Sequence, residues 1–399
     1  MRGSGTRWTR CGTRTIWRSF GALGGHRGGY GTDVDDVGLS KVDPSFWAER
    51  RVLLTGHTGF KGGWAALWLA SMGARVTGLA LAPETDPSLF DLANVAQDLD
   101  SRIVDVRDRQ DVAAIITETD PEIVLHMAAQ PLVRHSIAQP AETFAVNVLG
   151  TVYVLDALRN RPALNAALIV TTDKVYQNHE RGIPFVETDP LGGHEPYGAS
   201  KAAAEIAVEA MARTYFDSSG VQIATARGGN VIGGGDFSSD RLVPDIIRAV
   251  ACGSRPVLRN PSAIRPWQYV LDCLAGYFCF LQALATKKTR NRALNFGPST
   301  GGVSVQALSN SILSALDAMQ EWDSDPSQSH NEANILELDT TQAHTVLGWR
   351  DHFPGDRAVQ ATAAWYVAWR QGHDMRAQSL AAIDDFMMVQ ESADSALSI

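Results

Sequence analysis

The stretch Thr55-Gly56-His57-Thr58-Gly59-Phe60-Lys61-Gly62 follows a short apolar run at residues 51–54 and precedes an apolar stretch at 62–72 with helical spacing. In such a strand–turn–helix unit, Gly56 permits the tight turn, Gly59 lets the backbone approach a pyrophosphate, and Gly62 lets the helix pack closely on the strand. The diphosphate then lies at the positive helix N-terminus. The turn predicts a dinucleotide site, although its GxxGxxG spacing differs from that of ordinary dehydrogenases. The alternative is a purely structural glycine turn.

Strand-like and helix-like segments alternate beyond this turn. The expected strands are residues 51–56, 74–81, 103–106, 122–129, 166–172 and 221–226, and the expected helices are 62–72, 109–118, 143–158 and 197–216. This alternation predicts an α/β fold with a doubly wound parallel sheet of the Rossmann type and right-handed crossovers. Ligands are then expected beyond the carboxyl ends of the strands.

The rhythm becomes less regular after Arg227. The sequence predicts short helices at 244–252, 271–285, 304–317 and 356–369, a strand at 293–296 and a polar loop at 322–334. The pair Trp365 and Trp369 is expected to pack in the core. We expect residues 45–227 to form a cofactor-binding domain with a returning segment near 268–298. Residues 228–267 and 299–385 would form a smaller, mainly C-terminal α/β substrate lobe, and 386–399 a flexible tail.

The first 44 residues differ from the rest, because Gly and Arg dominate and no acidic residue precedes Asp33. A disordered leader is the favoured interpretation. A transit peptide and an RNA-binding Arg/Gly arm are the alternatives. The segment lacks the apolar stretch of a secretory signal, which argues against export.

Composition excludes several classes of protein. The 399 residues are 45% hydrophobic and 20% charged, as in soluble globular proteins, and the net charge of -9 argues against a nucleic-acid partner. No run of about 18 apolar residues is visible, so no membrane span is expected. The 4 cysteines lack CxxC spacing and fit a reducing cytoplasm. We expect no metal site, since neither HExxH nor an Asp-rich loop occurs.

Tyr197-Gly198-Ala199-Ser200-Lys201 places a phenol and an amine four residues apart, on one face of the expected helix. A neighbouring ammonium stabilises a phenolate and lowers the pKa of the phenol. Tyr197 would then act as a base that takes a hydroxyl proton while a hydride leaves the same carbon.

The chain resembles the extended short-chain dehydrogenase/reductases that modify nucleotide sugars, and among them the 4,6-dehydratases that act on CDP-glucose. The resemblance covers roughly residue 46 to the C-terminus. Besides the turn and YxxxK, it rests on LALAP at 79–83, PSLF at 87–90, HMAAQPLVR at 126–134, TDK at 172–174, GNVIGGGD at 229–236 and IRPWQ at 264–268. It implies an NAD-dependent homodimer or homotetramer that oxidises C4 of the hexose, removes water across C5 and C6, and returns the hydride to C6.

The resemblance also assigns roles to single residues. Tyr197 would be the base at the C4 hydroxyl, Lys201 its electrostatic partner and a ribose ligand, and Thr172 would bind the 4-oxygen. Asp173 would protonate the departing C6 hydroxyl, as a carboxyl group kept partly neutral by burial. The implied cofactor residues are Gly56, His57, Thr58, Gly59, Phe60, Lys61, Gly62, Ala128, Ala129, Gln130, Thr171, Tyr197 and Lys201. The implied substrate residues are Gln130, Asn147, Asn230, Arg241 and Arg265.

Lys174 departs from the Glu that related dehydratases of other nucleotide sugars carry. A Lys can be a base only if desolvation or a neighbouring cation depresses its pKa. The identity of the C5 base therefore stays open. His126 is expected to be a hydrogen-bonded strand histidine and not a ligand.

The nature of the dinucleotide is less well specified. A carboxylate is expected near the end of the second strand to hold the ribose of NAD. Glu84 and Asp86 come slightly late for this role, and no Arg awaits a 2′-phosphate, so NAD is favoured over NADP. Asp105 and Val106, expected to end the third strand, are candidates for contact with adenine, and a turn cap is the alternative for Asp105.

Overall fold

The computed structural model describes residues 40–180, 182–319, 321–325 and 336–397. The expected leader at 1–44 lies outside the described residues except for 40–44, and these residues pack into the body of the protein. Val42 is buried, and the Asp43 carboxylate caps helix α1 (Pro44–Trp47). The Asp43 backbone N–H donates to Gln282. Residues 40–44 are therefore part of the folded body and not of the leader expected there. The loop expected at 322–334 falls largely outside the described residues.

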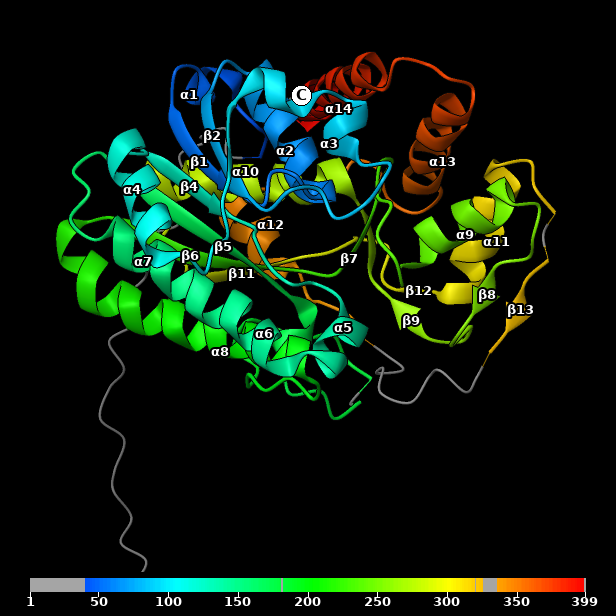
Figure 1. Ribbon diagram of the computed structural model, residues 1–399, viewed down its shortest axis with the longest axis horizontal. Coiled ribbons are helices and arrows are strands. Elements are labelled where there is room, and N and C mark those ends of the chain that lie inside the picture. Colours follow the sequence, from blue (N-terminus) through cyan, green and yellow to red (C-terminus); the bar gives the residue numbers. More distant parts are fainter. Residues whose placement is uncertain (1–39, 181, 320, 326–335, 398–399) are drawn as a thin grey trace, which may run out of the picture. The chain divides into compact units, whose positions relative to one another are not determined.

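A seven-stranded sheet with strand order β11-β6-β5-β4-β1-β2-β3, all parallel, forms the centre of the described chain (Figure 1). This order confirms the predicted Rossmann-type fold. The direction of crossover reverses between β1 and β4, which marks the edge where ligands bind in such sheets. The strands are β1 (Arg51–Thr55), β2 (Arg75–Ala80), β3 (Asp100–Ile103), β4 (Ile123–His126), β5 (Ala166–Thr172), β6 (Gln222–Gly228) and β11 (Ala293–Phe296).

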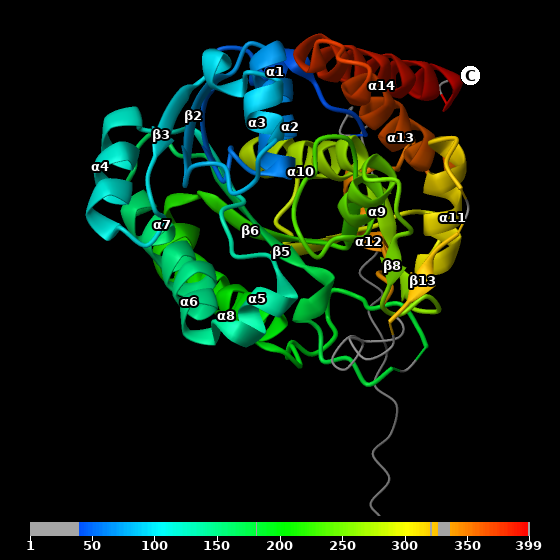
Figure 2. The same cartoon turned by 45° about the vertical axis from the view of Figure 1, so that its right-hand side comes forward.

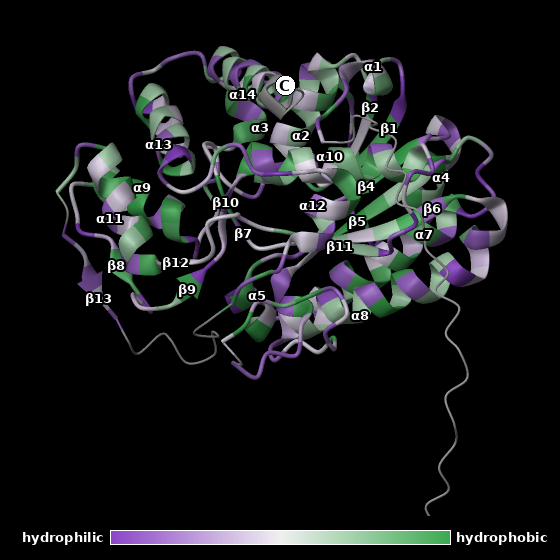
Figure 3. Ribbon diagram, turned by 180° about the vertical axis from the view of Figure 1, so that it is seen from behind, coloured by the Kyte–Doolittle hydropathy of each residue, from purple (hydrophilic) through white to green (hydrophobic). Residues whose placement is uncertain are grey.

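Helices cover both faces of this sheet (Figures 1 and 2). One face carries α2 (Phe60–Ser71), α10 (Val270–Ala285) and α12 (Thr341–Leu347), and the other carries α4 (Arg109–Thr119), α7 (Thr151–Leu158) and α8 (Pro196–Met211). Successive strand residues face alternate layers: Val52 and Leu54 belong to the first core cluster and Leu53 to the second. Burial on both faces explains why β4 and β5 are almost wholly apolar, as their colour in Figure 3 shows.

The helices expected at 143–158 and 197–216 each contain a π-helical turn. The helix expected at 143–158 is α6 (Pro140–Phe144), a π turn over Ala145–Gly150, and α7. The helix expected at 197–216 is α8 followed by a π turn over Ala212–Phe216. Gly150 leaves room for a core side chain, because a β-carbon there would lie 2.7 Å from Val106 Cγ1.

Two expectations about element boundaries are corrected. The third strand is Asp100–Ile103 instead of 103–106, so Asp105 and Val106 lie in the loop after it. In place of the flexible tail expected at 386–399, helix α14 (Met375–Leu397) continues the fold. Its Phe386 is fully buried, with its ring centroid 5.5 Å from that of Trp68.

A second group of elements lies beside the carboxyl ends of β5 and β6 (Figure 1). Its helices are α9 (Leu242–Ala251), α11 (Val305–Ala315) and α13 (Asp356–Arg370). Its short strands are β7 (Asn230–Ile232), β8 (Val257–Leu258), β9 (Ile264–Arg265), β10 (Trp267–Tyr269), β12 (Val303–Ser304) and β13 (Asp323–Ser324). Trp365 is buried and Trp369 packs against Phe237 with ring centroids 5.0 Å apart, as the expected core pair requires. The chain returns from this lobe to the sheet as α10 and β11.

Candidate active site

The glycine turn has the geometry that a diphosphate site needs. Gly56 has a φ of 81°, and a β-carbon on it would lie 2.9 Å from the backbone nitrogen of Ala128. Gly59 is the N-cap of α2, and no side chain there accepts from the first-turn N–H groups. Those N–H groups stay directed at the space beyond β1, where a diphosphate would accept from them. The turn therefore fits a dinucleotide.

His57 and Thr58 tie this turn to the neighbouring strands. His57 Nε2 lies 2.8 Å from Ser101 Oγ, and Thr58 Oγ1 donates to the Leu81 carbonyl at 2.8 Å. Gly78 makes room for the imidazole, because a β-carbon there would lie 2.5 Å from His57 Cγ. Burial lowers the pKa of His57 to about 4, so the ring is neutral near pH 7.

Asp105 caps the turn after β3. From the sequence, this role was the alternative to a contact with adenine. Its carboxylate accepts from the Arg107 backbone N–H at 2.8 Å and forms an ion pair with the Arg107 guanidinium. This hydrogen bonding lowers the pKa of Asp105. Val106 is buried in the second core cluster.

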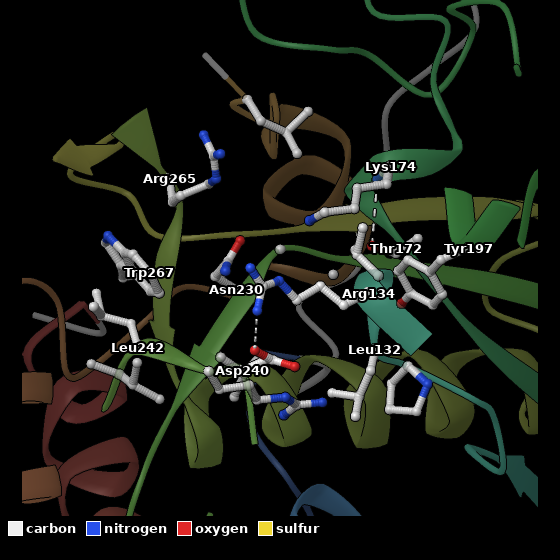
Figure 4. Close-up of a pocket in the computed structure, with 18 of the residues that line it drawn as sticks. Leu132, Arg134, Thr172, Lys174, Tyr197, Asn230, Asp240, Leu242, Arg265 and Trp267 are labelled. Atoms are coloured by element: carbon white, nitrogen blue, oxygen red, sulfur yellow. Dashed lines mark hydrogen bonds and ion pairs between the residues drawn. The ribbon is translucent and has the colours of Figure 1, made fainter. Parts of the chain in front are cut away.

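A cavity of about 640 Å³ opens at the carboxyl ends of β5 and β6, against the second lobe. Figure 4 shows Thr172, Lys174 and Tyr197 on one side of it, and Asn230, Arg265 and Trp267 on the other. The cavity thus joins residues from both parts of the chain. Of the predicted site residues, it is lined by Lys61, Ala129, Thr171, Thr172, Lys174, Tyr197, Lys201, Asn230, Arg241 and Arg265.

Tyr197 and Lys201 lie in the first two turns of α8, and Glu195 caps that helix. Lys201 Nζ is buried and donates to the Val170 carbonyl at 2.9 Å. Burial raises the pKa of Tyr197 to about 12, against a lowering by the Thr172 hydroxyl. Burial, and then the charge of Lys61, lower the pKa of Lys201 to about 7. The expected lowering of the phenol pKa by Lys201 is therefore not observed, because desolvation dominates.

Asp173 and Lys174 form a single helical turn directly after β5. Asp173 is fully buried, and its Oδ1 accepts from Thr172 Oγ1 at 2.9 Å and from Lys174 Nζ at 3.4 Å. Its Oδ2 has no hydrogen-bond partner among the described residues. A buried carboxylate oxygen without a donor is costly in a resting fold, which is typical of a group kept for a ligand.

The basic residues expected to meet the substrate lie in the cavity wall. Arg241 Nη1 lies 3.1 Å from Asp236 Oδ2, and Arg265 donates to its own neighbour, the Ile264 carbonyl. The buried Oδ1 of Asn230 has no partner within the described parts of the chain. Gln130 and Asn147 differ from these. They bind each other, with Gln130 N 2.9 Å from Asn147 Oδ1, and neither lines the cavity.

His126 is the hydrogen-bonded strand histidine that was expected. It is buried, 2.7 Å from Thr55 Oγ1 and 3.0 Å from Thr151 Oγ1. Sequence reasoning missed a buried network beneath the site, in which the Arg227 guanidinium meets the Glu205 carboxylate at 2.7 Å. Its signal was available, because Glu205 is four residues after Lys201 and Arg227 ends an apolar strand.

The doubly wound sheet, the glycine turn and the Tyr-x-x-x-Lys pair together define a dinucleotide-dependent enzyme of the Rossmann class. Residues 52–297 match the model of the NAD dependent epimerase/dehydratase family, and the chain belongs to this family.

The chain is 40% identical over 353 residues to the CDP-glucose 4,6-dehydratase of Salmonella typhimurium, covering 87% of this chain and 98% of that protein. It is 28% identical over 344 residues to a dTDP-glucose 4,6-dehydratase of Xanthomonas campestris pv. campestris, covering 80% and 95%. In fold it is similar to the UDP-glucose-4-epimerase of Stenotrophomonas maltophila with bound NAD, with a TM-score of 0.72, 22% identity and coverage of 81% and 100%.

Proposed function

We propose that this protein dehydrates CDP-glucose to CDP-4-keto-6-deoxyglucose and water, with NAD as its cofactor. The observation that carries the proposal is the buried Asp173 carboxyl, which accepts from Thr172 and Lys174, two residues that line the same cavity as Tyr197 and Lys201. An epimerase needs the Tyr–Lys pair alone, whereas elimination needs an acid for the leaving hydroxyl as well. The 40% identity to a CDP-glucose 4,6-dehydratase supports the same substrate.

The dinucleotide would lie along the glycine turn, with its diphosphate at the first-turn N–H groups of α2. When bound, NAD supplies the hydride acceptor for C4 and the hydride donor for C6. The turn glycines leave space for the backbone to approach the diphosphate, and Ala129, Thr171 and Lys201 line the adjoining cavity. NAD is favoured over NADP, because Leu81 and Ala82 follow β2 and offer no positive charge for a 2′-phosphate.

The chain's own residues then divide the proton transfers. Tyr197 takes the proton of the C4 hydroxyl, and the Thr172 hydroxyl, which lines the same cavity, holds the 4-oxygen. Lys201 stabilises the phenolate that forms. Asp173 delivers a proton to the C6 hydroxyl, which leaves as water, while the C5 proton passes to a base. Lys174 remains the candidate base by position. When the proton shared by its pair with Asp173 lies on the carboxyl, the pair presents the carboxylic acid and the neutral amine that the two proton transfers need.

The diphosphate of the substrate would meet Arg241 and Arg265, which line the cavity with Asn230. Guanidinium groups bind phosphate oxygens in a bidentate manner. Arg241 pairs with Asp236 at 3.1 Å, so an anion would compete with that carboxylate or share the guanidinium with it. Gln130 and Asn147 would support the site indirectly, by fixing the loop after β4.

The test is incubation of the protein with NAD and, separately, CDP-, dTDP-, UDP- and GDP-hexoses. A 4-keto sugar is read by its absorbance in alkali. We expect product from CDP-glucose. An epimerase would instead give a C4 epimer without a keto chromophore, which chromatography of the nucleotide sugars separates. Failure to convert CDP-glucose would refute the proposal.

A homo-oligomer in the cytoplasm is the proposed state. The run Pro140–Leu158 is long and apolar enough to cross a membrane by composition, contrary to the sequence expectation, and 39% of it is buried. Asp156 within it pairs with Arg109 and Arg159, and Asn147 bonds Ser200, so we assign the run to helix packing. Its exposed Phe144 and Leu149, with Ile206 and Tyr215 from the neighbouring α8 segment, offer an apolar face for a second copy.

A further inference from the structure

Lys61 belongs to the glycine turn, yet its side chain lines the substrate cavity. Among residues 55–62, Lys61 is the one that lines the cavity together with Tyr197 and Lys201. Its Nζ lies 5.8 Å from the ring centroid of Tyr277, a buried residue of α10. The side chain therefore runs from the expected cofactor site to the catalytic pair.

This is an unfavourable place for an ammonium group. Lys61 is the second residue of α2, at the positive end of the helix dipole. It forms no ion pair within 4.0 Å among the described residues, and burial lowers its pKa. The helix dipole and the loss of water both disfavour a cation here, and no direct counter-ion among the described residues offsets them. Such a group destabilises the fold and is typical of a functional site.

Charged and titratable groups face Lys61 from three parts of the chain. Cys273 lies on α10, Asp173 follows β5, and Asp236 and Arg241 come from the second lobe. Both carboxylates have nearer partners than Lys61: Asp173 accepts from Thr172 and Lys174 through Oδ1, and Asp236 pairs with Arg241. Lys61 therefore influences its neighbours through the electrostatic effect of its charge and not through a direct ion pair.

One of these neighbours is Lys201 on α8, which lines the same cavity. After burial, the charge of Lys61 is the largest influence that lowers the pKa of Lys201, and Glu205 opposes it. Both side chains line one cavity, and because Lys201 is buried and Lys61 half-buried, water screens their repulsion less than at an open surface.

We propose that Lys61 is a positioning residue of the catalytic pair, because it holds a second positive charge in the cavity beside Lys201 and sets the pH range in which Tyr197 and Lys201 work. The inference rests on the proposed function for its kinetic test, but not for its titration test.

The sign of the effect follows from the repulsion. Lys201 must be protonated to stabilise the phenolate, so activity is lost at high pH as Lys201 loses its proton. Lys61→Met removes the repelling charge, and the pKa of Lys201 rises. The basic limb of the kcat/KM profile therefore moves to higher pH, by on the order of one pH unit. Lys61→Arg keeps the charge and leaves the limb in place.

The experiment measures kcat/KM for CDP-glucose against pH for the wild type, Lys61→Met and Lys61→Arg. Lys288→Met, which removes an exposed lysine outside the cavity, is the matched control. A shifted limb in Lys61→Met alone supports the proposal. A rate reduced equally at every pH, with the limb unmoved, overturns it and leaves Lys61 a structural residue.

A second measurement works without turnover. Acetic anhydride labels unprotonated amines, and peptide mass spectrometry gives the labelling of Lys201 at each pH. We expect the titration of Lys201 to shift upward by about one unit in Lys61→Met and to stay unchanged in Lys61→Arg and Lys288→Met. An unshifted titration overturns the inference. If the wild type does not convert CDP-glucose, the proposed function fails while this titration still decides the role of Lys61.

Discussion

A β-carbon on Gly62 would lie 1.9 Å from the carbonyl oxygen of Gly56, which is far inside van der Waals contact. The first turn of α2 therefore packs directly on the backbone of the turn that precedes it. This contact fixes the direction of the helix N-terminus toward the space beyond β1.

Gly62→Ala is expected to weaken NAD binding and to lower the free energy of unfolding by about 1–3 kcal/mol, because backbone atoms must move apart. Gly63→Ala is the control, since the one tight contact of its β-carbon would be with the flexible Leu89 side chain, at 3.1 Å, while the His57 carbonyl oxygen would lie at an ordinary 3.9 Å. Urea unfolding and NAD titration by tryptophan fluorescence measure both effects. Equal behaviour of the two variants would contradict the packing role of Gly62.

Asp173→Asn should bind NAD normally and form about 10²–10⁴-fold less 4-keto product, because the amide cannot protonate the leaving hydroxyl. Asp240→Asn, which changes a carboxylate in the cavity wall, serves as the control for a changed charge. Product absorbance in alkali and NAD titration are the measurements. Normal product formation by Asp173→Asn would remove it from the acid role.

The buried pair of Arg227 and Glu205 lies beneath the catalytic helix, and Glu205 also accepts from Thr171 Oγ1 at 2.6 Å. Arg227→Met should lower the free energy of unfolding by about 3–5 kcal/mol, because it leaves the buried Glu205 carboxylate without its counter-ion. The double variant Arg227→Met, Glu205→Met should recover part of that loss. Urea unfolding of the wild type, the two single variants and the double variant gives the free energies of a double-mutant cycle. If the two single losses of stability add up to the loss in the double variant, Arg227 and Glu205 are not coupled.

His126 makes stability depend on pH. Burial lowers its pKa from 6.5 to about 3, so the unfolded chain binds a proton that the folded chain does not. The contribution of neutral His126 to the free energy of unfolding is fully present above pH 6.5. For each pH unit below 6.5 the free energy of unfolding falls by about 1.4 kcal/mol, until the pH reaches the pKa of the folded state. His126→Gln should reduce the slope of unfolding free energy between pH 7 and 5. An unchanged slope would show that other groups cause it.

Ile206→Glu places a charge on the apolar face of α8, where Ile206 is 62% exposed. If that face joins two copies, the variant should be monomeric in light scattering at concentrations where the wild type is not. Ile183→Glu is the matched control, since Ile183 is 58% exposed and lies outside the helices. An unchanged mass for Ile206→Glu would exclude this face as the interface.

Much of the sheet could be predicted, because strands buried on both faces leave unbroken apolar runs and the turn needs glycine at fixed spacings. The third strand could not be placed well. Three of its residues, Asp100, Ser101 and Arg102, are polar, since it forms the sheet edge. The apolar Ile103 and Val104 drew the prediction toward the following loop.

The sequence was sufficient to name the residues of the candidate site, but not to predict the direction in which their side chains point. Nothing in the sequence indicated that the Gln130 side chain donates to Thr143, or that Asn147, in the π turn between α6 and α7, accepts from the Gln130 backbone N–H. The direction of Lys61 was equally hidden, because its position in the turn suggested a backbone role. Boundaries at the C-terminus failed because Phe386 contacts Trp68, far away in sequence.

The position of β11 at the sheet edge has a consequence for synthesis. This strand, Ala293–Phe296, pairs with β6 but is translated long after it, with β7 to β10 in between. Until β11 emerges from the ribosome, β6 presents an apolar edge with unpaired backbone groups, which is a template for aggregation. A chain that stops before Ala293 would keep that edge permanently, so premature termination there should yield insoluble protein instead of a free cofactor-binding domain.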